Sequence, residues 1–254
     1  MKWIVSPETL LDHVVAYTIW AGEVMEESLK KNHNPSQYIM AMIPFWPPFY
    51  TAILQAAGVL AINKESKTAI IIYQQNHTPE SILLHNHDIW SILGKTLTFP
   101  DELKKLPKTI AQFTHYTQFT QFTDNIENHI YFIRTLSEVE KLVIVGIGSY
   151  VDQKKIDTVL EHIYKKVSDA ITFFVHNFSQ EKEFDVCRDE DDIMIGNIIS
   201  HKIKDIQNHT YQIPKIFADR SHKLKRIPVV VAYTNTGDLG GNKEKTNGYA
   251  CLIA

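Results

Sequence analysis

Cysteine and long apolar runs are both scarce in this 254-residue sequence. The two cysteines, Cys187 and Cys251, lie far apart and form neither a CxxC motif nor a zinc-ligand spacing. A disulfide framework is therefore not indicated, and a reducing compartment is expected. Residues 1–30 are rich in acidic side chains and lack the apolar run of a signal peptide. No segment approaches the roughly 20 apolar residues of a membrane helix. We expect a cytoplasmic protein without a membrane partner.

An excess of charge of either sign is also absent. The formal net charge is −3, and acidic and basic residues alternate along the chain without long blocks. A basic face that would attract nucleic acid or an anionic membrane is therefore not predicted. The hydrophobic and charged fractions, 44% and 22%, are ordinary for a folded protein.

Short apolar runs alternate with amphipathic segments, which is typical of an α/β fold. Runs without a helical period indicate buried strands: Tyr38–Ile43, Ala69–Ile72, Lys141–Gly148, Ala170–Val175, Ile227–Tyr233 and Gly248–Ala254. Helices are expected over Pro7–Lys31, Thr51–Ile62, Asp101–Leu106, Asp152–Val167 and Ile193–Ile203. The pattern gives no reason to divide the chain. We predict one domain, residues 1–254, with a three-layer α/β/α sandwich around a mixed, mostly parallel sheet.

Polar clusters follow two of the expected strands, and each cluster contains a histidine. Gln74–Thr78 follows the strand Ala69–Ile72 and includes His77, and His176–Gln180 follows the strand Ala170–Val175. Ligands of open α/β sheets sit beyond the carboxyl ends of the strands. A site is therefore expected there. The alternative is that Gln74–Thr78 only satisfies backbone groups of its own loop.

Other motifs give weaker signals. His85 and His87 alternate as on one face of a strand, but a metal site needs a third ligand that this spacing does not supply. Gly146 and Gly148 resemble a phosphate-binding turn, yet Val151 stands where a third glycine is needed.

Two acidic segments also carry expectations. Asp189–Asp192 should stabilise the start of the helix Ile193–Ile203 through its dipole. The same acidic run should raise the pKa of the Cys187 thiol, which argues against a cysteine nucleophile. Asp124, Glu127 and His129 form a further group of acid–base candidates.

Three stretches carry a resemblance to a known family. They are Ala232–Ala250 (AYTNTGDLGGNKEKTNGYA), Gln75–Thr78 followed by Trp90, Leu93 and Gly94, and Glu127–Ile133 followed by Val143–Gly146. Their order resembles the Memo family, whose bacterial members are called AmmeMemoRadiSam system protein B. The likeness spans residues 38–254, without the family's amino-terminal Ala-Gly-x-Phe-Tyr-Pro signature. It implies a fold similar to that of the class III extradiol ring-cleaving dioxygenases.

The ligand positions implied by the resemblance are mostly replaced. The family's Asn-His-Thr histidine is matched by His77, whereas Phe45 stands at the histidine of Pro-His-Ala-Gly-Tyr. In the Ser-Ser-Asp-Leu-Ser-His motif, Asn177 replaces the aspartate and Gln180 the histidine.

Two further positions depart from the family. The histidine of Glu-His-Ser falls on Asp124, and the carboxy-terminal cysteine of animal members falls on Leu239. A catalytic metal site needs about three good donors. The family's metal site therefore looks dismantled, although a rearranged site around Asp124, His77 and His176 is an alternative.

Two functions remain open. The favoured hypothesis is a cofactor-free protein that binds a small molecule or a protein partner at the strand ends. Its expected cleft residues are Phe45, Trp46, Asn76, His77, Asp124, Asn177, Gln180 and Asp238. Aromatic side chains beside a few polar groups are typical of binding pockets. The alternative is a dioxygenase-like oxidoreductase that holds iron, copper or zinc at His77 and uses His129 or His176 as acid–base.

Overall fold

The computed structural model describes residues 38–44, 56–62, 65–75, 78–86, 89–92, 95–106, 112–115, 126–178, 180–206 and 212–254. Ten strands of this part form one sheet. They are β1 (Met40–Ile43), β2 (Thr68–Gln75), β3 (Ile82–Asn86), β4 (Ile89–Ile92), β5 (Lys95–Thr98), β6 (Gln112–His115), β7 (Lys141–Gly148), β8 (Ile171–Val175), β9 (Val229–Asn235) and β10 (Gly248–Ile253).

Four parallel strands form the centre of the sheet, in the order β7-β2-β8-β1. Each is an apolar run in which almost every residue is buried. Burial on both faces explains why these runs show no alternation of apolar and polar residues. Because the four strands are parallel and in register, their carboxyl ends lie together at one edge of the sheet.

Antiparallel strands extend the sheet on both sides. On one side β10 lies antiparallel between β1 and β9. On the other side β3 runs antiparallel to β7 and parallel to β6, while β5 joins β7 to β4. The parallel strands are joined through helices, as such pairs require.

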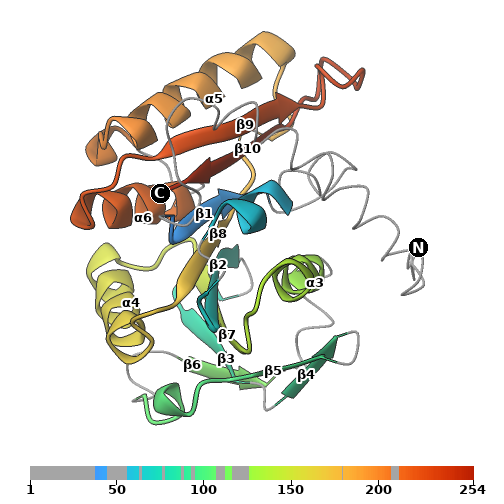
Figure 1. Ribbon diagram of the computed structural model, residues 1–254. Coiled ribbons are helices and arrows are strands. Elements are labelled where there is room, and N and C mark those ends of the chain that lie inside the picture. Colours follow the sequence, from blue (N-terminus) through green and yellow to red (C-terminus); the bar gives the residue numbers. More distant parts are fainter. Residues whose placement is uncertain are drawn as a thin grey trace.

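Helices cover both faces of the sheet (Figure 1). One face packs against α3 (Ile126–Leu136) and the helical residues 56–61. The other face packs against α4 (Gln153–Lys166), α5 (Phe184–Ile199) and α6 (Gln212–Lys223). The chain is therefore a three-layer α/β/α sandwich around a mixed sheet, as the sequence predicts.

The sequence explains α4 in detail. Asp152 accepts a hydrogen bond from the Lys154 backbone N–H at 2.8 Å and so caps the first turn. The buried side chains Ile156, Val159, Leu160 and Ile163 follow the i, i+3, i+4, i+7 spacing of one helix face. The resulting apolar stripe docks α4 on the sheet.

Two helix boundaries were predicted wrongly. The helix expected over Ile193–Ile203 begins at Phe184, so the run Asp189–Asp192 lies inside α5 and does not stabilise its start. The helix expected over Asp101–Leu106 is only the short 3-10 helix η2 (Asp101–Leu103). The expected helix Pro7–Lys31 lies outside the described residues.

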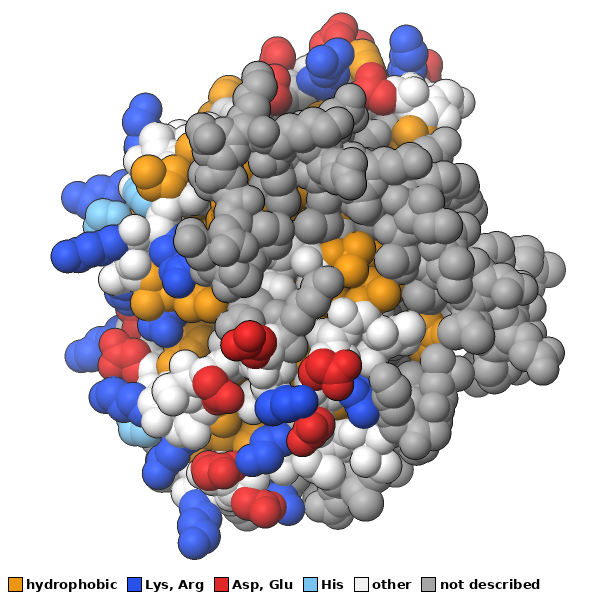
Figure 2. All heavy atoms as spheres, viewed as in Figure 1, with side chains coloured by type: hydrophobic (Ala, Val, Ile, Leu, Met, Phe, Trp, Pro, Cys, Tyr) orange, Lys and Arg blue, Asp and Glu red, His pale blue; other side chains and the backbone are white. Residues whose placement is uncertain are grey.

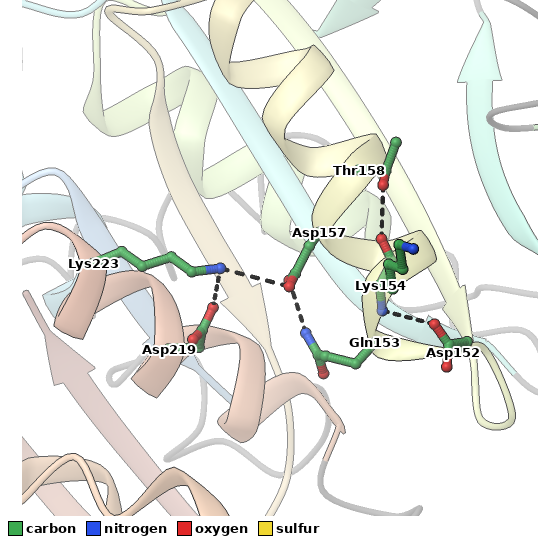
Figure 3. A network of polar contacts seen from close by, with 7 residues as sticks. All are labelled: Asp152, Gln153, Lys154, Asp157, Thr158, Asp219 and Lys223. Carbon is green, nitrogen blue, oxygen red and sulfur yellow. Dashed lines mark hydrogen bonds and ion pairs between the residues drawn. The ribbon is translucent and has the colours of Figure 1, made fainter.

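Charged side chains join α4 to α6 at the surface (Figure 3). The Lys223 ammonium lies 2.7 Å from an Asp219 carboxylate oxygen and 3.6 Å from an Asp157 carboxylate oxygen. Gln153 donates to Asp157 at 2.9 Å. The network connects the two helices. Because its groups are partly exposed, it adds only about 1 kcal/mol or less to the stability of the fold.

Acidic and basic side chains are interspersed over the lower part of the face in Figure 2. Lys and Arg side chains gather along the left edge of that view, over α4 and α6. A short 3-10 helix, η4 (Ile203–Asp205), lies between α5 and α6 in the chain.

Candidate functional site

The carboxyl ends of the four central strands bring four chain segments together. In the sheet register Ile43 and Tyr73 both pair with Val175, and Gln75 pairs with Gly148. The residues that follow these strands therefore lie along one edge. This is the position at which open α/β sheets bind ligands.

Five of the eight expected cleft residues lie outside the described residues. They are Phe45, Trp46, Asn76, His77 and Asp124. The side chain of Trp90 and those of His87 and Glu127 are outside them as well. The geometry of the site is therefore built from the described side chains on β2, β8 and β9 and on α3.

The side chain of Gln75, the last residue of β2, forms hydrogen bonds with the loop that follows this strand. Its side-chain amide donates to the Thr78 carbonyl at 2.6 Å and to the Ser81 carbonyl at 3.2 Å. The Thr78 backbone N–H donates in return to the Gln75 carbonyl oxygen at 2.9 Å. The side chain of Gln75 therefore satisfies polar groups of the turn after β2.

His176 follows β8 directly and is buried. Its backbone N–H donates to the Ile43 carbonyl at 2.9 Å, which ties the end of β8 to the end of β1. Its ring lies edge-on to Phe178, with centroids 5.9 Å apart. Burial lowers the pKa of His176 to about 3, since an imidazolium there would lose its hydration. The ring is therefore neutral at physiological pH.

The two amide residues beyond His176 are less buried. Asn177 is half-buried and Gln180 is exposed. Both are neutral oxygen donors, which suit iron, copper and zinc poorly.

His129 lies on α3 and is fully buried. Its Nε2 lies 2.9 Å from the Pro44 carbonyl oxygen, so this nitrogen carries a proton and donates it. The bond fixes α3 against the end of β1. A nitrogen that donates to a backbone carbonyl is not available as a general base.

Asp238 lies in the turn after β9. Its carboxylate accepts from the Asn235 side-chain amide at 2.7 Å, and its backbone N–H donates to the Asn235 carbonyl oxygen at 2.8 Å. The Asp238 side chain is nevertheless exposed, whereas Asn235 is fully buried. The two residues form a closed turn that shapes the edge of the site.

The glycines of β7 serve packing. A Cβ at Gly146 would stand 2.9 Å from the Tyr73 hydroxyl oxygen. A Cβ at Gly148 would overlap the backbone of Thr78 and Pro79. The likeness of these glycines to a phosphate-binding turn is therefore explained by close contacts within the protein.

A buried tyrosine–histidine pair lies beside Gly146. The Tyr73 hydroxyl and the His85 Nε2 are 2.9 Å apart, and burial raises the pKa of Tyr73. From the sequence, the spacing of His85 and His87 suggested only a pair of metal ligands. No alternation along β3 marks the face of His85, because Ile82, Leu83 and Leu84 are all apolar.

The burial of Asp191 on α5 was not predicted from the sequence. Asp191 is buried, accepts from the Tyr233 hydroxyl at 2.8 Å and lies 3.5 Å from the Cys187 sulfur. Burial, with the negative charge of Asp191 as the next cause, raises the pKa of Cys187 to about 12. The expected rise in the pKa of Cys187 is confirmed, with burial as a larger cause than the neighbouring carboxylate.

No group of three or more His, Cys, Asp or Glu side chains is arranged to hold a metal within the part of the chain that the structure describes. A helix long and apolar enough to cross a membrane is likewise missing from that part. No protein-family model matches the chain, and no curated protein matches it either.

Proposed function

We propose that this chain is a Memo-like binding protein that has lost the metal chemistry of that family. Its ligand, a small molecule or a segment of a protein partner, would occupy the edge of the sheet where β1, β8, β2 and β7 end. The cell compartment that suits such a protein is the cytoplasm, since both cysteines are free and buried.

His129 carries this proposal. The rival oxidoreductase needs an acid–base residue within reach of a substrate, with a pKa near the working pH. His129 is fully buried, and its Nε2 donates a hydrogen bond to the Pro44 carbonyl. The imidazole of His176 stays neutral far below physiological pH. Neither histidine therefore suits proton transfer, whereas both fit a role in shaping the strand ends.

The sequence adds a second support. Phe45 and Leu239 stand at positions where the family resemblance implies donors, and neither side chain donates to a metal. Phe45 and Trp46 follow β1 in the sequence after Pro44, and aromatic side chains suit the apolar part of a ligand.

The first experiment measures metal content. The full chain and its His77→Ala variant are purified under reducing, anaerobic conditions, and their iron, copper and zinc are determined by mass spectrometry. We expect the two proteins to contain the same amount of each metal, and neither to open catechol rings. One equivalent of metal that only the native protein holds would overturn the proposal in favour of the oxidoreductase.

The second experiment measures the binding of an apolar probe to the proposed cleft. Anilinonaphthalene sulfonate serves as the fluorescent probe, with Trp46→Ala as the test variant and Ile227→Ala as its control, since Ile227 is 71% exposed and lies before the start of β9. We expect one equivalent of probe to bind the folded protein and Trp46→Ala alone to weaken it. Equal binding by both variants contradicts an aromatic cleft after β1.

A further inference from the structure

Two histidines away from the strand ends lie against each other where α5 and α6 end. The ring centroids of His201 and His222 are 5.1 Å apart, and the ring planes meet at 63°. His201 directly follows Ser200, the C-cap of α5, and His222 belongs to the last turn of α6. Two separate helices thus bring the imidazoles together.

The backbone of His201 lies in the left-handed region, where histidine is found more often than most other non-glycine residues. Its φ is 52°, in the left-handed region, and the Lys202 N–H donates to the Asn197 carbonyl at 2.8 Å. The His201 N–H donates to the Ile198 carbonyl at 3.2 Å. These two bonds make a Schellman ending of α5, whose left-handed residue is usually glycine or asparagine. The helix ending therefore explains the backbone of His201, and the role of its ring has to be inferred from its side-chain surroundings.

The side chain of His201 gives a second observation. Its Nε2 is buried and has no hydrogen-bond partner in the part of the chain that the structure describes. Buried polar atoms in native proteins are almost always paired. A neutral imidazole nitrogen is the commonest protein ligand of a metal ion, and a bound metal would supply the missing partner.

The distance between the rings suits one shared metal. Two imidazoles that bind zinc at about 2.0–2.1 Å and at the tetrahedral angle have centroids about 5 Å apart. His222 is exposed, so its ring can turn a nitrogen toward the buried Nε2 of His201.

Near His201 and His222, the helix ends favour a bound cation and the neighbouring lysines disfavour it. The carbonyl ends of α5 and α6 carry partial negative charge, which favours a cation at the end of each helix. Among the neighbouring cations, Lys223 is paired with Asp157 and Asp219, while Lys202 and Lys225 are exposed and screened by solvent.

We propose that His201 and His222 chelate a divalent transition-metal ion of the class that imidazole suits, namely zinc, nickel or copper. Water completes the coordination, because no third His, Cys, Asp or Glu side chain of the described residues joins the pair. A site with two protein ligands exchanges its metal with the solvent and differs from a closed structural zinc site.

The metal site is separate from the proposed binding cleft. Gln212, the first residue of α6, donates to the Ser149 carbonyl at 2.9 Å, beside the end of β7. His222 lies ten residues further along the helix, or about 15 Å. The pair of histidines therefore lies away from the end of β7.

Calorimetric titration of the metal-stripped full chain with zinc chloride and nickel chloride tests the proposal. The titration is carried out in the His77→Ala background. We expect one equivalent to bind, and His222→Ala or His201→Asn to weaken that binding about 10²-fold or more, because chelation depends on both rings. Asparagine tolerates the left-handed conformation, so His201→Asn keeps the end of α5.

His162→Ala provides the matched control. His162 is an exposed histidine on α4 whose Nδ1 bonds to the Thr158 carbonyl at 2.7 Å. Undiminished binding in His222→Ala and His201→Asn, or an equal loss in His162→Ala, overturns the metal site. If the native chain binds metal and the His77→Ala background does not, both this inference and the loss of metal chemistry at the strand ends are wrong. Binding that depends on His222 alone overturns the chelate.

Discussion

Burial of His176 changes its acid–base chemistry. The residue is buried at the end of a central strand, and its pKa falls from 6.5 to about 3. A histidine that must stay neutral to fold makes stability depend on pH. The same property excludes it as a proton donor at neutral pH.

The sign of this dependence follows from proton binding. Between pH 6.5 and about 3 the unfolded chain binds a proton at His176 that the folded chain does not bind. The free energy of unfolding should therefore fall as the pH drops through this range. By pH 4 the loss due to His176 amounts to about 3 kcal/mol.

Urea unfolding at pH 7 and pH 4 checks this prediction. The His176→Gln variant does not titrate at this position, so its stability should fall by about 3 kcal/mol less than that of the native chain. His162→Gln, at an exposed position, should behave as the native chain does. An unchanged pH dependence in His176→Gln would show that the imidazole does not control acid stability.

At the scale of elements, α5 is fixed to β10 by a close contact. Gly248, the first residue of β10, lies so near Asp191 that a Cβ would overlap the carboxylate. Tyr233 on β9 donates to the same carboxylate. One buried acid of α5 thus touches both strands at that end of the sheet.

Substitution of Gly248→Ala should lower the free energy of unfolding by about 2–3 kcal/mol, because the added methyl forces Asp191 or β10 to shift. Gly196→Ala is the matched control on α5 itself. A Cβ at Gly196 has no neighbour within 4 Å, so alanine should raise stability by about 0.5–1 kcal/mol through its helix propensity. Urea denaturation measures both. Equal effects of the two substitutions would contradict the close contact.

Sequence patterns predicted the central strands better than the helix that carries Asp191. The apolar runs of β2, β7 and β8 mark strands buried on both faces, although β2 continues through the polar residues Gln74 and Gln75. The first half of α5 contains many acidic residues and few apolar ones, so it shows no clear helical period. The helix was therefore predicted to begin at Ile193, whereas it begins at Phe184. The strand end of β8 was predicted as well, but not the burial of His176, because burial depends on neighbours that are distant in the chain.

At the scale of the whole molecule, two apolar cores share one sheet. Cys251 belongs to the core on the α3 face, while Cys187 lies on α5, on the opposite face. Both thiols are buried, and burial raises the pKa of each to about 12. Side chains of β1, β2 and β8 contribute to both cores, so one face cannot unfold without exposing the other.

We therefore predict a single cooperative unfolding transition. Variants that retain one thiol each, Cys187→Ser and Cys251→Ser, should react with a thiol reagent at the same urea concentration at which far-ultraviolet circular dichroism is lost. Reaction of either thiol well before the loss of secondary structure would show that one face unfolds by itself. A chain of two domains would give that result.

The sequence by itself determined the class of the fold and the edge where a site is expected. Apolar runs and amphipathic segments are local patterns, and polar residues lie at or just after the ends of β2 and β8. Only the tertiary structure decided which polar groups are already used. Pro44 provides the acceptor for His129, and Tyr73 the partner for His85. The contact between His201 and His222 likewise depends on how α5 and α6 pack. Such pairings join residues far apart in the chain, and no local pattern carries them.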